Sequence, residues 1–189
     1  MKKIVLIAAA AFISLAASAQ DLKFGFVDFT ELVQLMPEAD SARVQTEAAS
    51  VDAQETYKAM VEEYQLKAQQ FEQKSASWSQ AIKDSKANEL QQIMARIQEF
   101  EQAIQQELQQ LQNQLQAPIY EKAQKAVEEL AKAKGLAGVF EKSSLLYLDP
   151  TKMIDLTPEA RVALNIPEGR TLDQLHQELQ AKAQAAQGM

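Results

Sequence analysis

The sequence predicts an α+β protein that is predominantly α-helical, with a long antiparallel helical hairpin on a small β body. Three observations predict this class. Between Pro37 and Gly135 the chain has no glycine and one proline, Pro118, and is rich in Ala, Gln, Glu and Lys, which are good helix formers. Apolar residues recur in this stretch every seven residues, as in a coiled coil. Short segments rich in Phe, Val and Leu flank it on both sides and are typical of strands.

The N-terminal end has the composition of a secretory signal peptide. Lys2 and Lys3 form a basic start, residues 4–16 are apolar, and an Ala-Ser-Ala site at 17–19 predicts cleavage before Gln20. The apolar run is too short to span a membrane, and no Cys follows it to accept a lipid. We therefore expect the mature protein to be exported.

Charge and cysteine content limit the partners and the means of stabilisation. The chain of 189 residues carries a net charge of −7, and loss of Lys2 and Lys3 in an N-terminal segment without acids would bring the mature form to −9. A protein this acidic is a poor binder of nucleic acids and anionic membranes. The chain has no Cys, so an exported form must be stabilised by burial or oligomerisation rather than by disulfides.

The β body is expected to begin with a strand at residues 22–29, LKFGFVDF, because of their Phe and Val content. Residues 30–36 are expected to add one or two helical turns, and Pro37 is expected at the first position of the long helix. After the helical stretch, residues 136–150 are expected to form two strands joined by a turn at 142–143.

Two further helices are expected at the C-terminal end. Thr157 and Pro158 are the residue types of an N-cap and a first helical position, so a helix should begin there. After a Pro-Glu-Gly break, Thr171 and Gln174 form a predicted capping box for a last helix that continues to about residue 183.

Two apolar stripes with a seven-residue repeat define the expected seam between the arms of the hairpin. Aromatic residues recur in the first stripe, and aliphatic residues dominate the second. The predicted seam residues are Tyr57, Val61, Tyr64, Phe71, Trp78, Ile82, Leu90, Ile97, Ile104, Leu108, Leu111 and Leu115. The aromatic rings can pack against the returning helix as a core or stay partly exposed for other chains, and the two interpretations are compatible.

The turn between the arms is expected at residues 83–88, KDSKAN, a short polar run between the two stripes. Folding the chain there pairs residues whose numbers add to about 172, as the antiparallel seam requires. With this pairing, Trp78 faces Met94 and Tyr57 faces Leu115.

The expected arms are long and thin. Each has about 47 residues and extends ~70 Å at the helical rise of 1.5 Å per residue. A pair of helices has no globular core, so the base of the hairpin must be anchored elsewhere. Pro118 lies in the returning helix and should kink it, either as a hinge or as a tolerated bend.

Three segments of the chain resemble the Skp/OmpH family of periplasmic chaperones. They are FGFVDF at 24–29, PIYEKAQKA at 118–126 and DLT at 155–157. The resemblance also includes the signal peptide and the long hairpin, and it extends over residues 22–164. The last twenty-five residues lie outside it.

The resemblance implies a periplasmic homotrimer, in which strands of three chains complete a small β-barrel and three helical hairpins surround a cavity. The cavity would hold unfolded outer-membrane β-barrel proteins and prevent their aggregation, without ATP or another cofactor. Three strands of one chain are too few for an independently stable body. By position, the barrel and trimer-interface residues would be Phe24, Phe26, Val27, Val139, Phe140, Leu146 and Leu148.

The charges at the expected tip differ from the basic tip of the best-known member of this family. The charged residues here sum to zero and are Glu72, Lys74, Lys83, Asp84, Lys86 and Glu89. We therefore do not expect lipopolysaccharide or anionic-membrane binding by this chain on the basis of the resemblance. Capture of clients is expected to depend on apolar contacts and on basic clients.

Three apolar residues are candidate client contacts. Met60 and Leu66 lie off the predicted seam, and Met94 is a weaker candidate because the predicted pairing already places Trp78 opposite it. Methionine is flexible and polarisable, which suits promiscuous contacts. Isolated exposed apolar residues are also common on ordinary protein surfaces, and that alternative applies to all three.

No enzyme, metal or cofactor site is expected. The sequence has no Cys nucleophile and no Gly-rich phosphate loop, and its single histidine, His176, is placed as a surface residue of the last helix. Nucleic-acid binding is excluded by charge and by export. The alternative to a chaperone is a structural coiled-coil adaptor of the cell envelope that binds one folded partner, which should have a concentrated apolar patch at its tip or base.

The expected domain organisation follows from these signals. Residues 1–19 form the signal peptide, and residues 20–37 and 135–166 form the β-rich body. Residues 38–134 form the coiled-coil hairpin. Residues 167–189 form a C-terminal extension that is expected to be helical.

Overall fold

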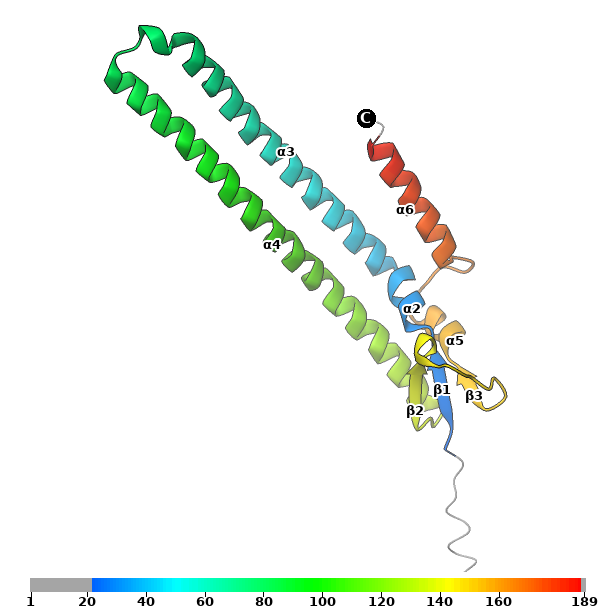
Figure 1. The fold of residues 1–189 in the computed structure, drawn as a ribbon. Coiled ribbons are helices and arrows are strands. Elements are labelled where there is room, and N and C mark those ends of the chain that lie inside the picture. Colours follow the sequence, from blue (N-terminus) through cyan, green and yellow to red (C-terminus); the bar gives the residue numbers. More distant parts are fainter. Residues whose placement is uncertain (1–21, 188–189) are drawn as a thin grey trace, which may run out of the picture. The chain divides into compact units, whose positions relative to one another are not determined.

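The computed structural model describes residues 22–187, and the chain divides into two compact units (Figure 1). The body unit comprises Met1–Leu32 and Lys122–Met189, and the hairpin unit comprises Val33–Glu121. Long helices and one small three-stranded sheet make up the structure, as the sequence predicts. The predicted signal peptide and its cleavage site before Gln20 lie outside the described residues. In the described part of the chain, no helix combines the length and apolar character that a membrane span requires.

Three short parallel strands form the sheet of the body unit, in the order β2-β1-β3. The central strand β1 (Phe24–Val27) pairs on one side with β2 (Gly138–Glu141) and on the other with β3 (Met153–Asp155). Parallel neighbours need a long connection, and the chain between β1 and β2 includes the whole helical hairpin. The sheet therefore joins the two ends of the hairpin sequence in one body.

Gly25 allows close packing in the centre of this sheet. A Cβ atom at this position would lie 2.8 Å from Cδ1 of Leu136 and 3.2 Å from the carbonyl oxygen of Ile154. A larger residue would therefore push the neighbouring segments away. Phe24 and Phe140 lie beside each other on adjacent strands, with ring centroids 5.7 Å apart.

The predicted second strand of a hairpin within residues 145–150 is wrong. Lys142–Ser144 forms a 3-10 turn, η2, and the third strand is Met153–Asp155, which runs parallel to β1. The Leu-rich composition of 145–148 resembles a strand, but Leu146 and Tyr147 are exposed rather than buried on one face. A direct turn would also have produced an antiparallel pair, whereas this sheet is parallel.

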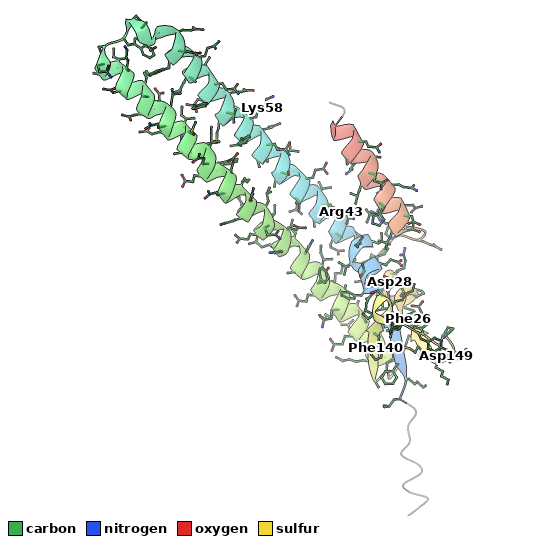
Figure 2. The ribbon with its side chains drawn as sticks, viewed as in Figure 1. Phe26, Asp28, Arg43, Lys58, Phe140 and Asp149 are labelled. Atoms are coloured by element: carbon green, nitrogen blue, oxygen red, sulfur yellow. The ribbon has the colours of Figure 1, made fainter. Side chains whose placement is uncertain are left out.

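The first short helix of the body begins at hydrogen bonds to one neighbouring and one distant side chain. Helix α2 (Phe29–Leu35) follows Asp28, which Figure 2 labels. Oδ1 of Asp28 accepts a hydrogen bond from the amide of Glu31 at 3.0 Å. The amide of Phe29 donates to Oε2 of Glu141 on β2 at 2.8 Å. These bonds satisfy amides at the start of the helix and fix it to the sheet.

Thr157 has a different role from the predicted N-cap. It is the first residue of α5 (Thr157–Ala163), and its Oγ1 accepts a hydrogen bond from the amide of Asp28 at 3.0 Å. The hydroxyl is used to join α5 to the end of β1, so Leu156 takes the N-cap position without a side-chain cap. The prediction of a helix start with Pro158 in the first turn is confirmed.

Arg161 connects α5 to the segments around it. Its guanidinium forms an ion pair with Glu31 and donates to the carbonyl oxygens of Pro167 at 3.2 Å and Arg170 at 2.6 Å. The last helix, α6 (Leu172–Gln187), then begins at the predicted capping box. The Thr171 amide donates to Gln174 Oε1 at 3.1 Å, and the Gln174 amide donates to Thr171 Oγ1 at 3.3 Å.

The core of the body unit is apolar and small. It lies between the sheet, the short helices and the end of the long helix. Its buried residues are Phe26, Val27, Leu32, Ala123, Val127, Leu156, Ala160, Leu164, Ile166 and Leu175.

The hairpin unit contains α3 (Pro37–Lys74), a 3-10 turn η1 (Ser75–Ser77) and most of α4 (Gln80–Ala133). Pro37 occupies the start of α3, as predicted. Within this unit the two helices run antiparallel and side by side (Figure 1). Helix α4 continues through Pro118 without interruption, so this proline is accommodated within the helix.

The predicted turn at residues 83–88 is wrong, because these residues are helical and the chain reverses at 75–79. Lys67 pairs with Glu89, Arg96 lies 3.5 Å from Glu63, and Tyr57 hydrogen-bonds Glu101.

The pairing of the two arms is shifted relative to the prediction. Tyr57 meets Glu101 instead of Leu115, fourteen residues away on the same helix. Fourteen residues are two heptads, so the shift leaves the apolar stripes in register with each other. The seven-residue repeat identifies which residues form the seam, but it is compatible with several alignments of the two arms that differ by whole heptads. The position of the helix break determines which alignment forms.

The observed pairing can be tested by cross-linking, because the chain has no cysteine of its own. We expect a short bismaleimide to join Lys67→Cys to Glu89→Cys within one chain. The control pair, Lys67→Cys with Gln105→Cys, matches the predicted turn and places the second site about 24 Å further along α4. Intact mass measurement should find the intramolecular product only for the first pair, and its formation in the control instead would contradict the observed pairing.

Glu89 makes the hairpin sensitive to acid. Hydrogen bonds from Lys67 and Lys86 lower the pKa of Glu89 from 4.5 to about 2. The lowered pKa stabilises the folded state at pH values above 4.5, and this contribution disappears as the pH falls through about 2. Thermal unfolding followed by circular dichroism should show that the difference between wild type and Glu89→Gln narrows over this range. Glu99→Gln is the control, since it removes a carboxylate from α4 without affecting this contact, and parallel pH profiles for wild type and Glu89→Gln would contradict the assignment.

Candidate functional site

Apolar surfaces, rather than a cluster of reactive groups, are the candidate site. Among the described residues, no group of three or more His, Asp and Glu side chains is placed to hold a metal ion. His176 lies exposed on α6. The acids and bases of the hairpin unit form surface ion pairs, such as Lys58 with Glu62 at 3.9 Å. The candidate functional groups are therefore exposed apolar side chains and the grooves between them.

Most of the predicted seam residues lie half-buried along the hairpin. Tyr57 and Ile82 are more exposed, at 38% and 45%. The half-buried members are Val61, Tyr64, Phe71, Trp78, Leu90, Ile97, Ile104, Leu108, Leu111 and Leu115. A seam that two helices alone form leaves its residues partly open to solvent.

Ile93 belongs to the second apolar stripe by its spacing, although it is not among the twelve predicted seam residues. It is 2% exposed, which makes it the most buried residue of α4 within the hairpin unit. Its position three residues after Leu90 places it on the same stripe, and its burial confirms that placement.

Trp78 packs at the turn, next to Phe71, with ring centroids 5.7 Å apart in an edge-on arrangement. The two rings come from the last turn of α3 and from the residue after η1. The predicted pairing of Trp78 with Met94 is wrong, because it is based on a turn at residues 83–88. Met94 is instead 44% exposed on α4.

An open groove lies between the arms in the middle of the hairpin, with a volume of about 640 Å³. We call it the mid-hairpin groove. Its α3 side is formed by small or polar residues, and its α4 side by four large apolar residues together with Glu107, Gln110 and Gln114. The lining includes Ala49, Asp52, Ala53 and Thr56 from α3, and Phe100, Ile104, Glu107, Leu108 and Leu111 from α4.

A second groove, of about 810 Å³, lies nearer the turn, and Leu66 contributes to its lining together with Tyr64, Phe71 and Leu90. Leu66 is 57% exposed. Of the three predicted client contacts, Leu66 therefore lines a groove, Met94 is exposed and Met60 is half-buried. The structure places them at separate positions of the hairpin unit rather than in one patch.

Tyr57 lies beside the mid-hairpin groove and interacts with an acid of the opposite arm. Its hydroxyl hydrogen-bonds Glu101, and this bond, together with the negative charge of the carboxylate, raises the pKa of Tyr57. The tyrosine therefore remains a neutral group that contributes both a ring and a hydrogen bond to the seam.

The predicted body residues fall into two groups. Phe26 and Val27 are buried within the single chain, and Phe24, Val139 and Leu148 are half-buried. Phe140 is 44% exposed and Leu146 is fully exposed. Beside Phe140 the body unit has a shallow apolar hollow of about 370 Å³, whose floor includes Val27 and Val127.

Comparison with known proteins identifies the family of the chain. The family model described as "Outer membrane protein (OmpH-like)" matches residues 23–164. The crystal structure of a proposed outer membrane chaperone (OmpH-like) from Caulobacter crescentus CB15 has a similar fold, with a TM-score of 0.68 and 12% sequence identity. The alignment covers 76% of this chain and 84% of that one. No curated protein sequence matches the chain significantly.

The family match extends from β1 through α5 and contains both arms of the hairpin. The resemblance seen in the sequence is thereby confirmed, and α6 lies beyond it. The chain belongs to the OmpH-like outer membrane protein family.

Proposed function

We propose that this protein is an ATP-independent holdase chaperone of the periplasm. It binds unfolded outer-membrane β-barrel proteins and prevents their aggregation during outer-membrane biogenesis. Membership of the OmpH-like family and the likeness to a proposed outer membrane chaperone support this function. The predicted signal peptide supports export to the periplasm.

The observation that carries the proposal is the distribution of exposed apolar residues over the hairpin unit. They occur at intervals along both arms instead of forming one patch. The large ones are Val44, Val51, Tyr57, Leu66, Ile82, Met94 and Tyr120. Many separate weak contacts suit an unfolded chain, whose apolar side chains are also dispersed, and together they hold it by multivalency. An adaptor for one folded partner would need a concentrated patch.

The holding reaction needs no catalytic residue and no cofactor. An unfolded barrel strand exposes apolar side chains and unpaired backbone groups, which associate with those of other chains. Contacts with the arms lower the concentration of free strands and so slow their association. Release follows when the barrel inserts and buries the same side chains in the membrane.

We further propose that three copies associate through the body unit. The outer strands β2 and β3 have free edges in the three-stranded sheet, and a sheet this small is marginal on its own. Phe140, Leu146 and Tyr147 are exposed next to this sheet, at 44%, 108% and 82%. Covering them in a closed barrel would stabilise the body and would bring three hairpins around one cavity.

Aggregation assays test the holdase function. We expect the mature protein, without nucleotide, to suppress light scattering when a urea-unfolded outer-membrane barrel is diluted into buffer. Leu66→Gln with Met94→Gln should raise the concentration needed for half suppression about fivefold, because two exposed apolar contacts are lost. Leu179→Gln, an equally simple change on α6, should leave it unchanged. Absence of suppression at large molar excess would contradict the proposal, and capture of one folded protein would support an adaptor instead.

Mass measurement in solution tests the association. We expect three copies per particle for the wild type and one bound barrel per particle after mixing. Leu146→Asp should shift the particle toward a single copy, because a charge would be buried at the interface, while its helicity by circular dichroism is retained. Val162→Asp is the control at another exposed apolar position of the body unit, 78% exposed. A wild-type protein that is a single copy at all concentrations would overturn the trimer.

A further inference from the structure

The net charge of the chain resides in one section of the hairpin unit. The hairpin unit, residues 33–121, has 14 of the 26 acids and 7 of the 19 bases, so the remainder has 12 of each and is neutral. Residues 44–57 and 97–121 contain 7 of those 14 acids and none of the bases, which leaves the other parts of the hairpin unit neutral as well. The whole net charge of −7 therefore falls within these two stretches.

The structure places this acidic section around the mid-hairpin groove. Residues 49–56 of α3 lie across the groove from residues 100–114 of α4. On α3, the section is bounded by Arg43 and Lys58, the nearest bases along that helix (Figure 2). Asp52 and Glu107 line the groove itself, one from each arm, and none of its lining residues is basic.

The groove combines an apolar wall with this charge. Ile104, Leu108 and Leu111 are half-buried, and the small side chains of Ala49 and Ala53 line the other side of the groove. A volume of about 640 Å³ is within the range of sites that bury several side chains of a ligand. Because the groove is open along the arms, it can admit an extended chain.

We propose that the mid-hairpin groove is a docking site for extended, basic-apolar segments of unfolded clients. Such a segment places Leu-, Val- or Tyr-type side chains against the α4 wall and Lys or Arg side chains near Asp52 and Glu107. This inference rests on the proposed holdase function and adds the chemistry of the preferred client segment. Acidic segments are disfavoured at this site by like-charge repulsion.

Charge complementarity also argues against a second hairpin as the occupant. Another copy would bring the same acidic section, with its 7 acids and no bases, to a groove of the same sign. A cationic segment instead neutralises Asp52 and Glu107 while its apolar side chains complete the packing that the alanines leave open. The attraction acts at exposed carboxylates and is therefore expected to weaken with salt.

Two fluorescent peptides of equal length are the probes, one of alternating Leu and Lys residues and one of alternating Leu and Glu residues. Binding to the full mature protein is measured by anisotropy at low salt and at about 0.5 M salt. We expect the Lys peptide to bind at least about tenfold more tightly than the Glu peptide at low salt, and this difference to shrink at high salt. Equal binding of the two peptides at low salt would overturn the proposal.

Ala53→Leu tests the groove directly by filling it. The added side chain should pack against Ile104 and weaken binding of the Lys peptide about tenfold, since it takes the place of a bound apolar side chain. Ala59→Leu makes the same change at an exposed position of α3 outside the groove and should bind as the wild type does. If the two variants bind alike, the docking site is not this groove.

Asp52→Asn with Glu107→Gln tests the charge without changing the shape. This double variant should weaken binding of the Lys peptide about fivefold at low salt and not at about 0.5 M salt. Glu99→Gln, in the same acidic section but not lining the groove, should have the smaller effect. An equal effect of Glu99→Gln would show a diffuse field in place of a site and would overturn the assignment.

The aggregation assay separates this inference from the proposed function. If wild-type protein suppresses aggregation but Ala53→Leu leaves peptide binding intact, the groove assignment fails and the holdase function stands. If wild-type protein does not suppress aggregation, the holdase function fails whatever the peptide result. A change in the number of copies per particle in Ala53→Leu would show that another chain occupies the groove, and this too would overturn the proposal.

Discussion

The hairpin unit depends on one constraint, which is that two antiparallel helices have a single seam to bury. Every other side of α3 and α4 faces outward, so the packing of the arm is decided by the side chains that meet along that seam. Near the turn, α3 contributes Tyr64 and Phe71, whose half-buried rings line the second groove. Further from the turn it contributes Ala49 and Ala53, and the apolar residues of α4 remain half open there. The single seam thus leaves a groove at each of these places, lined on the α3 side by aromatic rings near the turn and by alanines in the middle.

A two-helix arm has no core of its own, so its stability depends on the body unit. Its parallel sheet takes the central strand from the segment before the hairpin and the outer strands from the segment after it. Hydrogen bonds from Asp28 to Thr157 and from Phe29 to Glu141 then tie the start of the helices to those later segments. Both ends of the helical region are thereby closed by long-range contacts within one small core.

The distribution of charged residues also differs between the turn end and the middle of the hairpin. Near the turn, acids and bases alternate and pair across the arms, as Lys67 does with Glu89. In the middle, Asp52 and Glu107 line the open groove, and none of its lining residues is basic. Ion pairing suits a region that keeps its shape, whereas unbalanced charge beside uncovered apolar side chains suits a region that meets another chain.

The sequence by itself determined the local features: the helical class, the start at Pro37, the first strand, the capping box at Thr171 and the seven-residue seam. Each depends on neighbours within a few positions. Tertiary structure alone decided the position of the turn, because a repeat of seven accepts any shift by whole heptads, and the third strand, because pairing is non-local. The shift matters for the site. A turn at 83–88 would bring the acidic residues of α3 toward Lys122 and Lys125 on α4, whereas the turn at 75–79 places Asp52 and Glu107 in the lining of one groove.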